Sequence, residues 1–145
     1  MKKLPPNIHF TQNVNQQLNS CLKFFKPDRV AILVDENTLA HCLPKLPVVK
    51  KIPLIQINSG EKNKNIETCN IIWQQLTDFK FTRKSLLINL GGGVIGDMGG
   101  FVAATFKRGI QFINIPTTLL SQVDASIGGK LGIDFNKFKN HIGVF

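Results

Sequence analysis

Tyrosine is absent from the 145 residues of this sequence, and cysteine, histidine and acidic residues are few. The three cysteines are an odd number, lie more than twenty positions apart and form no CxxC pair, so they favour reduced thiols over a disulfide framework. The three histidines are isolated from one another, and no cluster of His, Cys and carboxylate residues has the spacing of metal ligands. The sequence therefore predicts no metal site within this chain.

Long apolar runs are lacking as well. No stretch approaches the ~20 apolar residues that cross a bilayer, and the N-terminal segment MKKLPPNIHF has no apolar core of the kind that a signal peptide carries. These features predict a cytoplasmic protein without a membrane partner. The hydrophobic content of 43% excludes a disordered chain, and the length suits one domain over residues 1–145.

Acidic residues are half as numerous as basic ones, 9 against 18, which leaves a net charge of +9. A nucleic-acid-binding surface concentrates arginine and aromatic residues, whereas here the lysines are scattered and there are only three arginines. We therefore expect no nucleic-acid partner. A phosphorylated, anionic small molecule explains the excess of lysine equally well.

Helical and strand patterns alternate along the chain. Apolar positions at helical spacing predict a helix that follows Thr11, its expected N-cap, and ends before Pro27. Apolar runs predict strands over 29–34, 52–57, 85–90 and 110–115. Between them we expect helices through Leu39 and Leu43, over about 66–76, and from the glycines at 91–93 to about 106. This order predicts an α/β fold, a Rossmann-like parallel sheet with flanking helices.

The C-terminal part of the sequence departs from this alternation. Residues 128–134 favour a loop or a hairpin over another strand-helix unit. The chain then ends on the apolar residues 143–145, so we expect the N-terminal part of a longer protein, with apolar surface that a further domain would cover.

Polar residues after the strands are the candidate ligands, because an open parallel sheet binds its ligand at the carboxyl ends of its strands. Asp35 and Asn37 follow the first strand, where a carboxylate can accept hydrogen bonds from ribose hydroxyls; a simple helix cap at Asp35 is an equal alternative. The second strand leads into Ser59-Gly60-Glu61-Lys62-Asn63-Lys64, a glycine turn of mixed charge that an ordinary solvated loop also shows.

The glycine-rich segment LGGGVIGDMGG follows the third strand. Successive glycines let the backbone approach a ligand, and the following helix points its free N–H groups at a pyrophosphate. Gly91, Gly93 and Gly96 satisfy G-x-G-x-x-G. The next acidic residue after Asp97 is Asp124, however, beyond the ~20 positions at which the ordinary dinucleotide fingerprint places its carboxylate. A tight strand-to-helix turn is the structural alternative.

After the fourth strand, the hydroxyls of Thr117 and Thr118 at a helix start can bond a phosphate or a ribose. One carboxylate, two lysines and a carboxamide follow beside glycine turns: Asp124, Lys130, Lys139 and Asn140. Together they suit a polyhydroxylated anion. A hairpin with surface lysines is the plainer interpretation.

The stretch from Leu90 to Phe145, with SGEKNK upstream, resembles the 3-dehydroquinate synthases of the sugar-phosphate cyclase family in order, spacing and residue type. The more distant glycerol dehydrogenases and iron-dependent alcohol dehydrogenases share GGG-x-x-x-D but are not expected to show QVDASIGGK followed by KN. The alternatives are a related sugar-phosphate cyclase, a glycerol dehydrogenase-like NAD-dependent enzyme, and a stand-alone, non-catalytic nucleotide-binding module.

The resemblance implies a lyase of the shikimate pathway, which leads to aromatic amino acids. Members of the family convert 3-deoxy-D-arabino-heptulosonate 7-phosphate, a phosphorylated seven-carbon sugar acid, into 3-dehydroquinate and phosphate. In that reaction NAD oxidises the substrate and the NADH formed later reduces it again. The N-terminal domain carries most NAD contacts. A helical C-terminal domain, absent from this chain, carries a divalent metal, zinc or cobalt. The resemblance thus implies that this chain alone is inactive, and that its partners are its own C-terminal domain and a second copy in a homodimer.

Residue roles follow from the same resemblance. Asp35, Asn37, Glu61 and Lys64 would hold the adenosine end of NAD, and Asp124 would reach the nicotinamide and the substrate hydroxyls. Lys130 and Asn140 would meet the substrate. Arg108 would donate to the substrate phosphate across a dimer interface, although an arginine facing solvent at a helix end is an alternative. The remaining NAD-binding positions implied are Ser59, Gly60, Lys62, Asn63, Gly92, Gly93, Val94, Ile95, Gly96, Asp97, Thr117, Thr118, Lys130 and Lys139.

Overall fold

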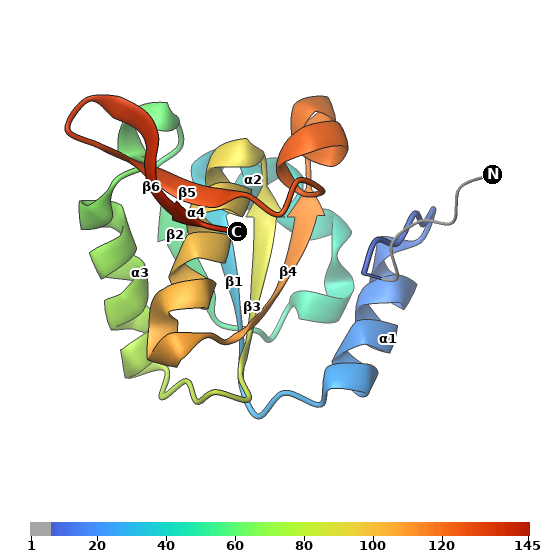
Figure 1. Ribbon diagram of the computed structural model, residues 1–145. Coiled ribbons are helices and arrows are strands. Elements are labelled where there is room, and N and C mark those ends of the chain that lie inside the picture. The colour runs from blue at the N-terminus through green and yellow to red at the C-terminus, as the bar shows by residue number, and fades with distance from the viewer. Residues whose placement is uncertain (1–6) are drawn as a thin grey trace.

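The computed structural model describes residues 7–145, and the N-terminal residues 1–6 lie outside it (Figure 1). Four parallel strands form a sheet in the order β2-β1-β3-β4, which confirms the Rossmann-like α/β fold expected from the sequence. The strands are β1 (Val30–Asp35), β2 (Leu54–Ile57), β3 (Leu86–Gly91) and β4 (Gln111–Pro116).

Helices cover both faces of the sheet. α1 (Val14–Phe25) and α2 (Glu36–His41) belong to one face, and α3 (Ile66–Asp78) and α4 (Gly93–Thr105) to the other. Alternate residues of β1 supply the two cores: Ala31 and Leu33 pack with the α3/α4 cluster, and Ile32 and Val34 with the α1 cluster. Burial on both sides explains why the strands are continuous apolar runs.

Five short helical turns complete the connections. They are η1 (Leu43–Lys45), η2 (Pro47–Val49), η3 (Glu61–Asn63), η4 (Phe106–Arg108) and the π-helical turn η5 (Ser121–Ala125). In the part of the chain that the structure describes, no helix combines the length and the apolarity that a membrane crossing requires.

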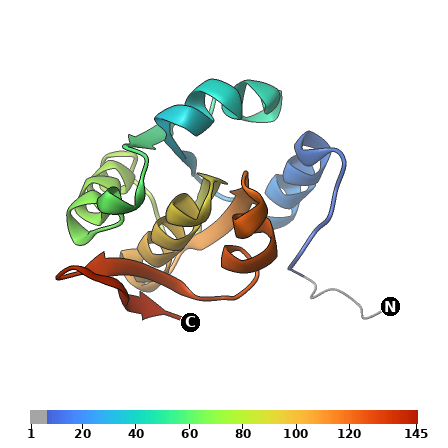
Figure 2. The same ribbon diagram turned by 90° about the horizontal axis from the view of Figure 1, so that it is seen from above.

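A two-stranded antiparallel hairpin, β5 (Leu131–Phe135) and β6 (Phe138–Val144), follows the sheet. Its turn consists of Asn136 and Lys137 with φ of 49° and 69°, the left-handed backbone that a two-residue hairpin turn requires. Ile133 is fully buried in the α3/α4 core, so the hairpin packs on the same side of the sheet as these helices (Figure 2). The hairpin, one of the two structures expected for residues 128–134, is confirmed.

Two expected helix boundaries were wrong. Asn13, and not Thr11, is the N-cap of α1, because the Asn13 Oδ1 accepts from the Gln16 amide at 3.0 Å. The Thr11 Oγ1 accepts instead from the Asn13 amide, one turn earlier. α2 ends at His41 instead of continuing through Leu43, since Pro44 cannot donate an amide to an α-helix and the chain tightens into η1.

Candidate functional site

The carboxyl ends of the strands lie level at one edge of the sheet. Strand register pairs Asp35 of β1 with Ile57 of β2, and Gly91 of β3 with Pro116 of β4. The loops that follow these four residues therefore meet at this edge, at the top of Figure 1. All site residues predicted from the sequence follow these strand ends or lie on the β5–β6 segment beside them, except Arg108.

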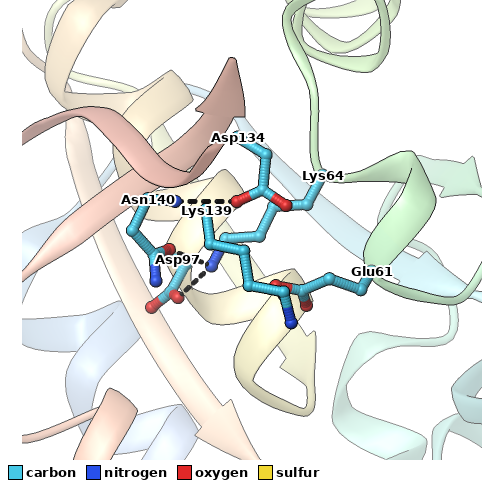
Figure 3. A network of polar contacts seen from close by, with 6 residues as sticks. All are labelled: Glu61, Lys64, Asp97, Asp134, Lys139 and Asn140. Carbon is cyan, nitrogen blue, oxygen red and sulfur yellow. Dashed lines mark hydrogen bonds and ion pairs between the residues drawn. The ribbon is translucent and has the colours of Figure 1, made fainter. Parts of the chain in front are cut away.

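Lys64 is the most buried charged group at this edge, with 4% of its side chain exposed. Its Nζ donates to the Asp97 Oδ2 and to the Asn140 Oδ1, both at 2.6 Å (Figure 3). The three residues come from the loop after β2, from α4 and from β6. A buried ammonium requires such partners, so Lys64 connects three segments that are distant in the sequence.

An irregularity in the hairpin aims Asn140 at Lys64. β6 contains more residues than β5 between the pairs Ile133↔Ile142 and Phe135↔Phe138, so the strand bulges there. Asn140 lies in the bulge with φ of 51°, and its amide donates to the Asp134 Oδ1 at 2.8 Å. The bulge thus turns the Asn140 side chain toward the site.

Asp134 fixes the hairpin to the loop after β2. Its amide donates to the Lys64 carbonyl at 2.9 Å, while its side chain holds Asn140 (Figure 3). Sequence analysis did not select Asp134 as a site residue. Its position in a strand next to the lysine-rich turn gave no signal of a contact with Lys64, because the two residues are separated by seventy positions.

Glu36 is a second residue that sequence analysis missed. From the first turn of α2 it accepts the Ser59 hydroxyl at 2.6 Å and the Ser59 amide at 2.9 Å. The hydrogen bond from the Ser59 side chain lowers the pKa of the Glu36 carboxyl below its ordinary value. Asn63 in turn donates to the Ser59 carbonyl at 2.6 Å. These contacts join the loop of residues 59–64 to the start of α2.

Helix α4 begins at the glycine-rich loop with its backbone accessible. Gly92 is the N-cap and provides no side-chain acceptor, so the first N–H groups of the helix are left for an external partner. The Thr118 methyl lies beside Gly92, 3.3 Å from where a Cβ would be. Gly93 starts the helix, and Val94 is partly exposed. This arrangement suits an anion at a helix N-terminus.

Ile95 and Gly96 enter this site only through their backbone. The Ile95 side chain is 1% exposed and packs in the α3/α4 core, and Gly96 is buried within the first turns of α4. β3 ends at Gly91 and α4 begins at Gly93, so the glycines also form the tight strand-to-helix turn that the sequence left as an alternative.

The two threonines after β4 adjoin the glycine loop. The Thr117 amide donates to the Gly91 carbonyl at 3.0 Å. The Thr118 Oγ1 lies 2.9 Å from the Ser121 Oγ and accepts from the Ser121 amide at 3.2 Å, so it also caps the turn that follows. Both residues therefore border the glycine-rich loop.

Asp35 forms the helix cap that the sequence left as an alternative. Its Oδ1 accepts from the Thr38 amide at 2.8 Å, and the Thr38 hydroxyl accepts from the Asp35 amide, which completes a capping box. The carboxylate has capacity for further hydrogen bonds, since each oxygen can accept more than one. Asn37 is exposed on the first turn of α2.

The remaining candidates on this edge are exposed. Asp124 lies in η5 and Lys130 directly precedes β5. The Lys139 Nζ lies 4.0 Å from the Glu61 Oε1 in a solvent-exposed pair (Figure 3). Exposed charges of this kind remain free to reach a ligand.

Arg108 lies at the opposite edge of the sheet. It follows the C-terminal end of α4 and precedes β4 by three residues, so it is at the amino ends of the strands. The structure does not bring Arg108 together with the other candidates of the same chain. Within residues 7–145, no group of three or more His, Cys, Asp and Glu residues that could hold a metal ion is found.

Comparisons with known proteins identify the family of this chain. The family model described as the 3-dehydroquinate synthase N-terminal region matches residues 54–145. The 3-dehydroquinate synthase of Parabacteroides distasonis is 46% identical over 137 residues, which are 92% of this chain and 39% of that protein. The chain thus spans about two fifths of this relative's length.

Solved structures share the fold at lower identity. A 2-deoxy-scyllo-inosose synthase complexed with carbaglucose-6-phosphate, NAD+ and Co2+ is 21% identical, with a TM-score of 0.82 over 91% of this chain and 38% of that one. The 2-epi-5-epi-valiolone synthase of Streptomyces hygroscopicus, with NAD+ and Zn2+ bound, is 22% identical, with a TM-score of 0.78 over 100% of this chain and 42% of that one. Because the family model matches most of this chain, the chain belongs to the 3-dehydroquinate synthase family. It corresponds to the N-terminal region of the members of that family.

Proposed function

We propose that this chain is the NAD-binding part of an enzyme that converts 3-deoxy-D-arabino-heptulosonate 7-phosphate into 3-dehydroquinate and phosphate. The observation that carries the proposal is the buried Lys64, which Asp97 and Asn140 hold beside an accessible helix N-terminus in a chain of this family. Burying a charge is costly even when it is paired, so a buried cation at the ligand-binding edge of a parallel sheet favours a functional role.

The residues of the carboxyl edge suit NAD. Gly92 and Gly93 leave room for a pyrophosphate against the first N–H groups of α4, and Thr117 and Thr118 extend that polar surface. Asp35 lies where a carboxylate can accept ribose hydroxyls at the adenosine end, while it also caps α2. When bound, NAD supplies a hydride acceptor and donor.

Lysines and amides at the same edge suit the substrate. The substrate carries a phosphate and a carboxylate, and two exposed cations lie near this edge: Lys130 directly before β5 and Lys139 in β6. Asp124 is placed to accept substrate hydroxyls. Lys64 keeps its charge compensated by Asp97, and Asn140 retains an amide group that can donate to the substrate while its oxygen accepts from Lys64.

A further region of the protein completes the site. Exposed apolar side chains gather after β4, at positions Leu119, Leu120, Val123 and Ile127, with 75%, 70%, 64% and 45% exposure. Apolar side chains grouped on one segment favour a covering partner. The proposed partner is the C-terminal region that relatives of this chain have.

The residues described here do not fit the zinc or cobalt ion implied by the family, because they form no group of three metal ligands. The ligands would have to come from the C-terminal region, so this chain alone is proposed to be inactive. Arg108 would serve the phosphate bound by a second copy, since it lies at the opposite edge from the site of its own chain. A cytoplasmic location stays a prediction.

The test uses the complete gene product, purified with zinc or cobalt and supplied with NAD and the heptulosonate phosphate. Release of inorganic phosphate together with 3-dehydroquinate is the expected result. Conversion of sedoheptulose 7-phosphate or glucose 6-phosphate without conversion of the heptulosonate would instead identify a related sugar-phosphate cyclase. Failure to bind NAD in isothermal titration calorimetry would reject the proposal.

A further inference from the structure

A basic depression of about 510 Å³ lies at the amino ends of the strands, away from the site described above. It is lined by Thr82, Arg83, Lys84, Lys107 and Arg108, four of which are cations. No acidic residue is among these five. The nearest carboxylate by hydrogen bonding is Asp28, which already accepts the hydroxyls of Thr82 and Ser85. The side chains that line the depression therefore carry four positive charges, and no ion pair of theirs is found among the described residues.

The backbone that carries Arg108 has an unusual conformation. After α4 ends, Lys107, Arg108 and Gly109 have φ of 50°, 67° and 115° in succession. Two non-glycine residues in the left-handed region are disfavoured, so the surrounding structure must hold them there. Main-chain bonds close the turn on one side, from Gly109 to the Phe106 carbonyl and from Ile110 to the Ala103 carbonyl, both at 2.9 Å.

Arg83 supplies a side-chain contact from the other side of the turn. Its Nε donates to the Lys107 carbonyl oxygen at 2.9 Å, across 24 positions of sequence. That carbonyl belongs to the peptide unit that joins Lys107 to Arg108. Because a peptide unit is planar, a hydrogen bond that fixes the direction of the Lys107 carbonyl also fixes the direction of the N–Cα bond of Arg108.

We infer that Arg83 is a positioning residue for Arg108. It holds the left-handed turn through the Lys107 carbonyl, so that the Arg108 side chain is directed into the basic depression. Only Nε is used in this bond, and the positive charge of Arg83 stays in the depression with that of Arg108. The inference rests on the proposed function, in which Arg108 binds the substrate phosphate of a second copy.

Lys84 provides a matched control for this inference. It is the next residue, is exposed, lines the same depression and carries the same charge, but no hydrogen bond of its side chain is found among the described residues. Lys84→Ala therefore removes a charge from the depression without releasing the turn. Arg83→Ala removes an equal charge together with the bond to the Lys107 carbonyl.

The experiment measures KM for the heptulosonate phosphate, kcat and the NAD dissociation constant in the complete gene product. Arg108→Ala should raise KM by about 10- to 100-fold, as expected for a lost charge-assisted hydrogen bond. Arg83→Ala should raise KM about 3- to 10-fold, with kcat and NAD affinity within about twofold of wild type. Lys84→Ala removes one charge from the depression but leaves the turn in place, so it should raise KM by less than Arg83→Ala does.

The double variant separates positioning from general destabilisation. If Arg83 acts through Arg108, Arg83→Ala should have no further effect on KM in an Arg108→Ala background. In this chain, Arg83→Ala should also shift the backbone amide NMR signals of Arg108 and Gly109, and Lys84→Ala should leave them in place.

Three results would overturn the inference. A raised KM in Arg108→Ala with a normal KM in Arg83→Ala would reject the role of Arg83 and leave the proposed function intact. Equal effects of Arg83→Ala and Lys84→Ala would show that charge alone matters. A normal KM in Arg108→Ala would reject the proposed role of Arg108 itself, and the role of Arg83 with it.

Discussion

Replacing Lys64 with alanine perturbs the link that joins three segments of the candidate site. The substitution removes the 2.6 Å bonds to Asp97 and Asn140 and leaves a carboxylate with 19% exposure without its cation. Breaking a buried ion pair on one side costs roughly 3–5 kcal/mol, and the partial exposure of Asp97 places the loss at the lower end, about 3 kcal/mol. In a domain of this size, that corresponds to a fall in Tm of about 6–12 °C.

Urea and thermal unfolding of this chain, followed by circular dichroism, measure the loss. Lys62→Ala is the control, because Lys62 is exposed in the same loop, and its removal should change stability by less than about 0.5 kcal/mol. Lys64→Met with Asp97→Leu should recover part of the loss, since neither charge then remains buried without a partner. Equal stability of Lys64→Ala and Lys62→Ala would refute the reasoning.

Four further substitutions test three other parts of the structure. Glu36→Gln should flatten the fall in stability at acidic pH. The Ser59 hydrogen bonds lower the pKa of the Glu36 carboxyl. The carboxylate therefore contributes fully to stability above its ordinary pKa of 4.5, and this contribution is lost as the pH falls through the lowered pKa. Urea midpoints measured from about pH 7 to about pH 3 would contradict this if they fell as steeply with pH in the variant as in wild type. Gly99→Ala should lower the free energy of unfolding by about 1–3 kcal/mol, because the new Cβ would overlap the buried Asn89 side chain. Gly96→Ala is the control: the nearest atom to its Cβ is 4.0 Å away, so the free energy of unfolding should rise by about 0.5–1 kcal/mol. A higher Tm for Gly99→Ala than for Gly96→Ala would reject this packing. Lys137→Gly should raise the free energy of unfolding by about 0.5–1 kcal/mol, because glycine adopts the φ of 69° in the hairpin turn without steric strain. A lower Tm of this variant would contradict the turn conformation.

The main elements of the fold could be predicted from the sequence because burial controls them. The apolar runs at β1 and β3 are buried on both faces, and the alternation of strands and helices left a parallel sheet as the simplest topology. Boundaries were less predictable. The cap of α1 depends on whether Thr11 or Asn13 reaches the first free amides, and both residue types favour the position.

The site could be predicted wherever it follows the end of a strand. Asp35, Gly92 and Thr117 adjoin strand ends, so their position at one edge follows from the topology. The pairing of Lys64 with Asn140 depends on a bulge in β6, and the role of Asp134 depends on a backbone bond to the loop after β2. Such contacts depend on the tertiary packing of the hairpin, which local sequence patterns do not specify.

NAD is expected to bind this chain at the carboxyl edge of the sheet. Titration of NAD into this chain labelled with 15N, followed by amide NMR, should shift the signals of Gly92, Gly93 and Val94 and those of residues 59–64. The signals of residues 82–84 and 106–109, at the opposite edge, should stay in place. Shifts confined to the opposite edge, or none at millimolar NAD, would contradict the claim that the carboxyl edge of this sheet is an NAD site.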